Sequence, residues 1–201
     1  MQLRPGLSLA VLLALAAPLS AQSGFAVVGG LTSATQSYEF EDGEEATGIG
    51  SRMGFAIGVA MERGMSNGLS FAPELLYVLK GSTDDDSDFY TKMSYIELPL
   101  LFRYGFATSG NARPYITAGP TVAFLASCTV GDDDDSQSCD DAYGADEAYK
   151  AIDYGLMFGL GVKFDRFGIS ARYEMGLANI TEESCCTEKN TALMLLGSVS
   201  F

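Results

Sequence analysis

Charged side chains recur at every second position within otherwise hydrophobic stretches of this sequence. In SYIELPLLFRYG (residues 94–105), Glu97, Pro99 and Arg103 occupy odd positions only. Side chains of a β-strand point alternately to two faces, so these three residues share one face. Read strand by strand, the same alternation places ten charged residues on one face of the predicted strands: Arg52, Glu62, Glu74, Glu97, Arg103, Arg113, Asp153, Lys163, Arg172 and Glu174.

Five of these ten residues are basic and five are acidic, which limits the chemistry they can perform. In a confined space such charges must pair or stay hydrated, so we expect a structural ion-pair network. The alternative is a charged constriction that selects solutes. The chain contains no His, which excludes Ser-His and Asp-His mechanisms and any His metal site, and it has no G-x-S-x-G motif. We therefore expect neither an enzyme nor a cofactor.

The elements that position these charges are predicted to be eight strands. Their connections alternate in length. Short turns such as RGMSNG and DRFG alternate with long polar loops that hold 20 of the 26 acidic residues, so the long loops share one end of a meander. The strands are predicted at residues 24–32, 50–62, 69–79, 92–104, 113–125, 151–164, 168–179 and 190–201.

One face of these strands is bulky and apolar, whereas the other is small or charged. A soluble barrel would turn the bulky face inward, and a transmembrane barrel would turn it to lipid. The small face is dominated by Gly, Ala and Ser, which suit a narrow interior better than a wet surface. The sequence therefore predicts an all-β fold, an eight-stranded antiparallel up-and-down transmembrane β-barrel. In residues 95–104, the even positions face lipid and the odd positions face the lumen. At Pro99, which lacks a ladder donor, we expect a local bulge.

The N-terminal residues have the layout of a cleaved signal peptide. One Arg precedes an apolar run from Leu7 to Leu19 that ends in small residues, so residues 1–21 are predicted to be the signal peptide and 22–201 the barrel domain. The mature chain would keep 11 basic residues against 26 acidic ones, a net charge of −15 that argues against nucleic acid as a partner.

The long loops contain all four cysteines and the densest acidic runs. Cys128, Cys139, Cys185 and Cys186 are expected to form disulfides in an oxidising compartment, and the sequence leaves their pairing open. The run Asp132, Asp133, Asp134 and Asp135 offers oxygen ligands for weak Ca²⁺ binding, but its spacing differs from the twelve-residue calcium loop. We expect these runs to be solvated rather than to form a metal site.

Four segments resemble the porin-family outer-membrane β-barrel domain of Gram-negative bacteria: YIELPLLFRYGF, ARPYITAGPTVAF, DYGLMFGLGVKF and RYEMGLANI. The resemblance implies an eight-stranded barrel in the outer membrane, where the partners would be membrane lipid and lipopolysaccharide. It also implies that the terminal Phe201 is read by the barrel assembly machinery. A structural or surface-interaction role with a mostly filled lumen is the main hypothesis. A narrow channel for small solutes and a soluble periplasmic, lipocalin-like carrier of an apolar ligand are the alternatives.

Overall fold

Eight long strands and one short hairpin strand make up most of the protein. The computed structural model describes residues 23–40, 43–44, 46–84, 87–132, 135–144, 149–182 and 186–201. The predicted signal peptide lies outside these residues. The elements are β1 (Ser23–Phe40), β2 (Ile49–Ser66), β3 (Leu69–Asp84), β4 (Tyr90–Gly105), β5 (Ala112–Gly131), β6 (Ser136–Ser138), α2 (Cys139–Tyr143), β7 (Ile152–Phe164), β8 (Phe167–Gly176) and β9 (Cys186–Ser200).

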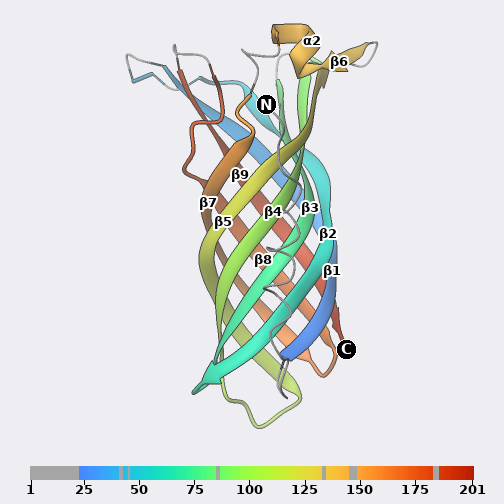
Figure 1. Cartoon of the computed structure of the whole chain (residues 1–201), viewed down its shortest axis with the longest axis vertical. Helices are drawn as coiled ribbons and strands as arrows, with labels where there is room; N and C mark the ends of the chain where they lie inside the picture. Colours follow the sequence, from blue (N-terminus) through green and yellow to red (C-terminus); the bar gives the residue numbers. More distant parts are fainter. Residues whose placement is uncertain are drawn as a thin grey trace, which may run out of the picture.

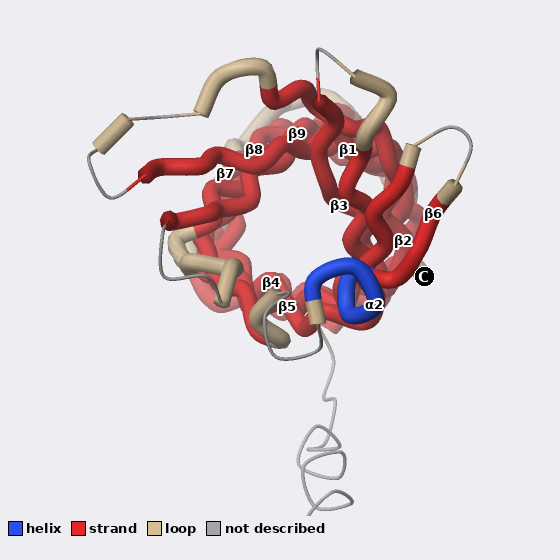
Figure 2. The backbone as a smooth tube through the Cα atoms, turned by 90° about the horizontal axis from the view of Figure 1, so that it is seen from above, coloured by secondary structure: helices blue, strands red, loops and turns tan. Residues whose placement is uncertain are grey.

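The long strands form a closed antiparallel barrel. Strand neighbours follow the chain, β1 also pairs with β9, and the pairing of β4 with β5 completes the ring (Figures 1 and 2). The short strand β6 pairs only with the end of β5, from Thr129 to Gly131. Because a closed sheet has no free edge, every long strand has a neighbour on both sides. The prediction of an eight-stranded antiparallel barrel is confirmed.

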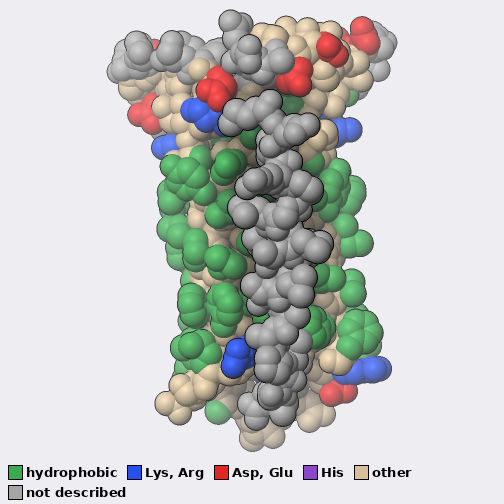
Figure 3. Space-filling model, in the orientation of Figure 1, with side chains coloured by type: hydrophobic (Ala, Val, Ile, Leu, Met, Phe, Trp, Pro, Cys, Tyr) green, Lys and Arg blue, Asp and Glu red, His purple; other side chains and the backbone are tan. Residues whose placement is uncertain are grey.

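The bulky apolar side chains point outward. They form a belt around the middle of the barrel, with charged residues above and below it (Figure 3). Leu195 is 53% exposed and Met53 is 65% exposed, whereas Leu101 on the opposite face is completely buried. This is the polarity of a barrel embedded in lipid. The alternative of a soluble carrier with an apolar interior is therefore wrong.

The two ends of the barrel differ in their connections. At one end, the turns are short, as at Asn67–Gly68 between β2 and β3, where both residues have positive φ values of 51° and 83°. A side chain at Gly68 would also meet the carbonyl oxygen of Gly105 at 2.7 Å. Short turns mark the periplasmic end of outer-membrane barrels, and the C-terminus lies at this end (Figure 1). The opposite, extracellular end carries the long loops.

A disulfide fastens the hairpin at the extracellular end of β5. Cys128 and Cys139 are bonded, with their Cα atoms 5.4 Å apart, and the bond ties β5 to the start of α2. Val130 and Cys139 form a small buried cluster beside it. The sequence left the pairing of the four cysteines undecided, and this bond gives the partners of two of them. Cys185 lies outside the described residues. No helix in the described part of the chain is long and apolar enough to cross a membrane.

The bulge expected at Pro99 is not formed. Pro99 pairs with Thr121 of β5, and the register with β5 is the same on both sides of this pair, while the shift in this ladder falls at Ser94 and Tyr95. A missing N–H removes one ladder bond. An inserted residue, by contrast, would turn the following side chains to the other face, Arg103 among them. Loss of a single donor is the smaller cost, so the register is kept.

Several strands are longer than the sequence pattern indicates. β1 continues through residues 33–40, which were expected in a loop, and it pairs with β9 as far as Phe40 and Cys186. β5 likewise reaches Gly131, six residues beyond its predicted end. About 9–11 residues suffice to cross a membrane, so these extensions carry the sheet past the apolar belt. There the alternation of apolar and polar residues ends while backbone pairing goes on.

The outward face can be tested with a charge at mid-strand. Leu195 pairs with Leu31 and Ala171 in the apolar belt. We predict that Leu195→Arg lowers the free energy of unfolding in phospholipid vesicles by about 2–4 kcal/mol, the cost of a basic residue near the bilayer midplane. Leu195→Ala is the control for lost side-chain volume. The chain has no Trp, so urea titrations are best followed by circular dichroism and gel mobility. Equal stability of the Arg and Ala variants would contradict the lipid-facing assignment.

Candidate functional site

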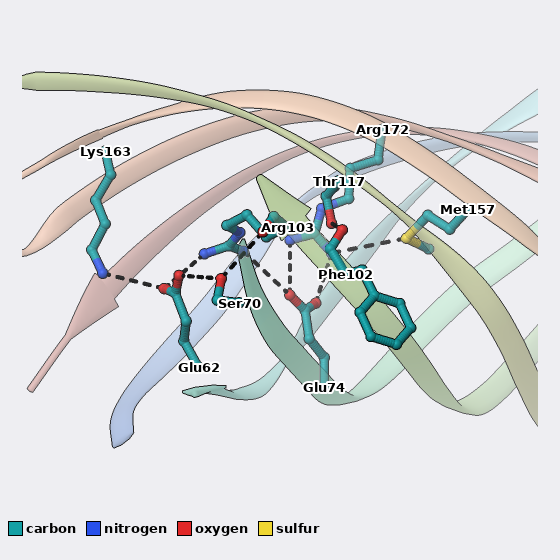
Figure 4. A network of polar contacts seen from close by, with 9 residues as sticks. All are labelled: Glu62, Ser70, Glu74, Phe102, Arg103, Thr117, Met157, Lys163 and Arg172. Carbon is teal, nitrogen blue, oxygen red and sulfur yellow. Dashed lines mark hydrogen bonds and ion pairs between the residues drawn. The ribbon is translucent and has the colours of Figure 1, made fainter. Parts of the chain in front are cut away.

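The lumen contains two clusters of ion pairs, the first toward the periplasmic end. Glu62 of β2 lies 3.0 Å from Arg103 of β4 and 3.5 Å from Lys163 of β7, so one carboxylate is shared by two cations (Figure 4). The Ser70 hydroxyl donates a 2.9 Å hydrogen bond to the same carboxylate. The guanidinium of Arg103 also lies over the ring of Tyr115, 4.3 Å from its centroid. Strands β2, β3, β4, β5 and β7 therefore meet in this cluster.

A deeper ion pair joins β8 to β3 across the bore. Arg172 donates two hydrogen bonds to Glu74, of 2.6 and 3.0 Å, in a bidentate arrangement. Both side chains are almost completely buried. Arg103 approaches the same carboxylate at 4.0 Å and thereby links this pair to Glu62 (Figure 4). Bidentate geometry is what makes a buried guanidinium and carboxylate a strong pair.

The second cluster lies at mid-height around Lys80. Its ammonium group is 2.7 Å from Glu174 of β8 and 3.0 Å from Glu97 of β4, and Lys80 is only 2% exposed. Asp153 of β7 accepts a 2.9 Å hydrogen bond from Asn190, and the same Asn190 amide donates to the Tyr95 hydroxyl at 3.1 Å. Three carboxylates thus face one ammonium group in this part of the lumen.

The structure brings seven of the ten predicted charges into ion pairs: Glu62, Glu74, Glu97, Arg103, Lys163, Arg172 and Glu174. Asp153 is buried and held by Asn190. The other two lie apart. Arg52 stacks over the ring of Tyr90 at 4.1 Å, and Arg113 is exposed at the periplasmic mouth. The observed network therefore contains seven of the ten charges, and its ion pairs leave out Asp153, Arg52 and Arg113.

Lys80 is the central residue that sequence analysis missed. The third strand was predicted to end at Leu79, just before Lys80, whereas β3 continues to Asp84. Lys80 has the parity of Glu74 and Leu76, so extending the strand by one residue would have placed it in the lumen. A hydrophobic pattern that stops at a charged residue gives no signal that the strand goes on.

Large side chains fill the bore where the two clusters meet. Leu101 and Met157 belong to one buried apolar cluster and Tyr95 to another, and all three are completely buried, as is Glu97. Toward the periplasmic end, a lumen-facing glycine makes room for another large side chain, that of Tyr115. A Cβ at Gly161 would lie 2.5 Å from the ring of Tyr115. Buried charges that are paired and buried side chains that interlock leave the described lumen closed at mid-height.

The extracellular loops do not assemble a metal site from the residues described. The backbone N–H of Asp135 donates to the Asp132 carboxylate at 2.9 Å, while Asp133 and Asp134 lie outside the described residues. Among the described residues, no group of three or more potential ligands is placed to hold a metal ion.

Tyr149 packs against the buried cluster of Val130 and Cys139 at the extracellular end. Burial raises the pKa of the Tyr149 hydroxyl, and the negative charge of Glu188 raises it further.

An outward apolar belt, a closed ring of eight strands and a charged, filled lumen define a small outer-membrane barrel. Residues 19–182 match the family described as outer membrane protein beta-barrel domain, and the chain belongs to this family. Its location is therefore the outer membrane. A comparison with curated proteins finds no significant match.

Neisserial surface protein A and the outer membrane enzyme PagL share the fold. Neisserial surface protein A has a TM-score of 0.50 and 16% identity, over 90% of this chain and 100% of that one. The outer membrane enzyme PagL has a TM-score of 0.52 and 15% identity, over 84% and 98%. OprG from Pseudomonas aeruginosa has a TM-score of 0.48 and 14% identity, over 89% and 96%. At such identities the likeness shows the fold alone.

The buried pair of Arg172 and Glu74 allows a double-mutant test. We predict that Arg172→Met destabilises the folded barrel by about 3–5 kcal/mol, because it leaves the Glu74 carboxylate buried without its partner. Arg172→Met combined with Glu74→Met should recover most of this loss. Urea unfolding in vesicles, followed by circular dichroism, measures both variants. Additive losses in the double variant would show that the two side chains do not act as a pair.

Proposed function

We propose that this protein is a closed membrane scaffold, which has a structural or surface-interaction role and holds acidic loops outside the cell. The observation that carries the proposal is the buried network that spans the lumen. Lys80 and Glu174 are 94 residues apart in the sequence, and Glu74 and Arg172 are 98 apart. Each pair joins strands on different sides of the barrel, so the network braces the wall and fills the bore together.

The same network argues against a pore or a catalytic centre in the lumen. A conducting path needs a continuous hydrated space, whereas Lys80, Glu97 and Tyr95 are buried at mid-height. A general acid or base must reach a substrate, and the carboxylates of Glu74, Glu97 and Glu174 are engaged with cations instead. PagL shows that this fold also carries an enzyme. The sequence here has no His to serve as a base.

The extracellular end is the surface we propose for interaction. The disulfide between Cys128 and Cys139 holds one acidic hairpin against β5, with Asp140 and Asp141 exposed in its short helix. Divalent cations would link such carboxylates to the phosphates of neighbouring lipopolysaccharide. At the other end, Phe201 is 80% exposed and follows β9 directly. We propose that the barrel assembly machinery reads this terminal aromatic residue.

Conductance across a planar lipid bilayer tests the closed lumen. We expect the pure protein, shown to be folded by its heat-dependent gel mobility, to give no steady channel steps. The double variant Lys80→Ala with Glu174→Ala removes one cation and one carboxylate and shortens two of the side chains that fill the bore. It should admit ions and produce small steps. Steady open-channel conductance of the unmodified protein would overturn the proposal in favour of a narrow channel.

A further inference from the structure

The periplasmic end of the lumen opens into a pocket that the ion-pair network does not fill. It has a volume of about 370 Å³ and is lined by charged residues of β2, β4, β5 and β7 together with Ser70 and Tyr115. Glycines 24, 64, 68 and 105 line the pocket too and leave it wide. The filled level around Tyr95 and Lys80 closes it from the extracellular side. We call this space the periplasmic vestibule.

Positive charge prevails in the vestibule although the protein as a whole is acidic. Arg103, Arg113 and Lys163 line it, and Glu62 is the acidic residue of its lining. Glu62 is already shared by Arg103 and Lys163. Arg113 makes no ion pair or hydrogen bond with any residue that the structure describes. Asp165 lines the adjoining outer cavity with Arg113 and Lys163, so a net positive charge remains even when it is counted.

Two of these cations are placed against each other. Arg113 and Lys163 are directly paired residues on neighbouring strands β5 and β7. Like charges opposite one another in a sheet destabilise it, and an anion lying between them would remove that repulsion. Both side chains line the vestibule, so an anionic ligand held there would offset this repulsion.

We propose that the periplasmic vestibule binds a small soluble phosphomonoester. Three cationic groups from three strands converge there, and a phosphomonoester offers several strong acceptor oxygens with a charge near −2 at neutral pH. A carboxylate offers one charge and two oxygens. The volume lies within the usual range for small-molecule pockets. Because the lining residues face the lumen, with Phe164 and Tyr104 on the outer surface, the barrel wall separates them from membrane lipid.

Calorimetric titration of the full-length folded barrel with glycerol 3-phosphate tests this proposal. The protein is held in phosphatidylcholine nanodiscs, and acetate serves as the probe with a single charge. We expect saturable binding of glycerol 3-phosphate and much weaker binding of acetate. Arg113→Gln and Lys163→Gln should each weaken the affinity about tenfold, because each removes one charge-assisted contact. Arg113→Lys, which keeps the charge, should retain most of it.

The matched control is Arg63→Gln. It removes the same charge from an exposed residue of β2 at the same end, and Arg63 does not line the vestibule. An equal loss in Arg63→Gln and Arg113→Gln would mean general attraction to the basic end and would overturn the site. The site would also be overturned if glycerol 3-phosphate gave no saturable heat at a concentration of about 10 mM, which would fill a site with a millimolar dissociation constant. Heat-dependent gel mobility verifies that each variant is folded.

The source of the phosphate is decided by a second set of nanodiscs that contain phosphatidylglycerol. Equal affinity for glycerol 3-phosphate in both lipids supports a soluble ligand. Loss of binding in phosphatidylglycerol would mean that a lipid headgroup occupies the vestibule, which would overturn the assignment to a soluble solute.

Discussion

Hydrocarbon offers no partner for a backbone hydrogen bond or for a charge, and this constraint governs the structure at every level. Backbone groups are satisfied only when the sheet closes on itself, as it does through the pairing of β4 with β5. Charged side chains are tolerated only on the inner face. Period two in the sequence, as at Glu97 and Arg103, is the direct consequence.

Closure with eight strands then creates a second problem, since the inner face is narrow and must hold charges at close quarters. The strands leave space for large lumen side chains by placing glycine and alanine opposite them, as Gly161 lies against Tyr115. The charges are satisfied by one another, with Arg172 on Glu74 and Lys80 between Glu97 and Glu174. A barrel filled in this way is braced from inside, which suits a scaffold for loops. Toward the periplasm, around Arg113, the described lumen keeps open space and a cation without an ion pair.

Parity and connection lengths were enough to predict the strand number, the outward face and most of the lumen charges. The alternation of apolar and polar residues is imposed by contact with lipid, so it is lost where the strands leave the membrane. For that reason the outer part of β1 was mistaken for a loop, and Lys80 was left outside its strand. Pairing inside the bore depends on shear and side-chain reach across the barrel, which no local pattern reports. The bond between Cys128 and Cys139 likewise depends on a hairpin whose sequence gives only spacing.

The most direct test of the closed, ion-paired lumen is the reactivity of its lysines. The chain has five, Lys80, Lys92, Lys150, Lys163 and Lys189. Treatment of the folded protein with a water-soluble amine-acylating reagent, followed by mass spectrometry, reports which of them water can reach. Lys80 should stay unmodified until the barrel is unfolded by boiling, while half-buried Lys92 reacts in the folded state. Modification of Lys80 in the folded barrel at the rate of Lys92 would contradict a closed lumen.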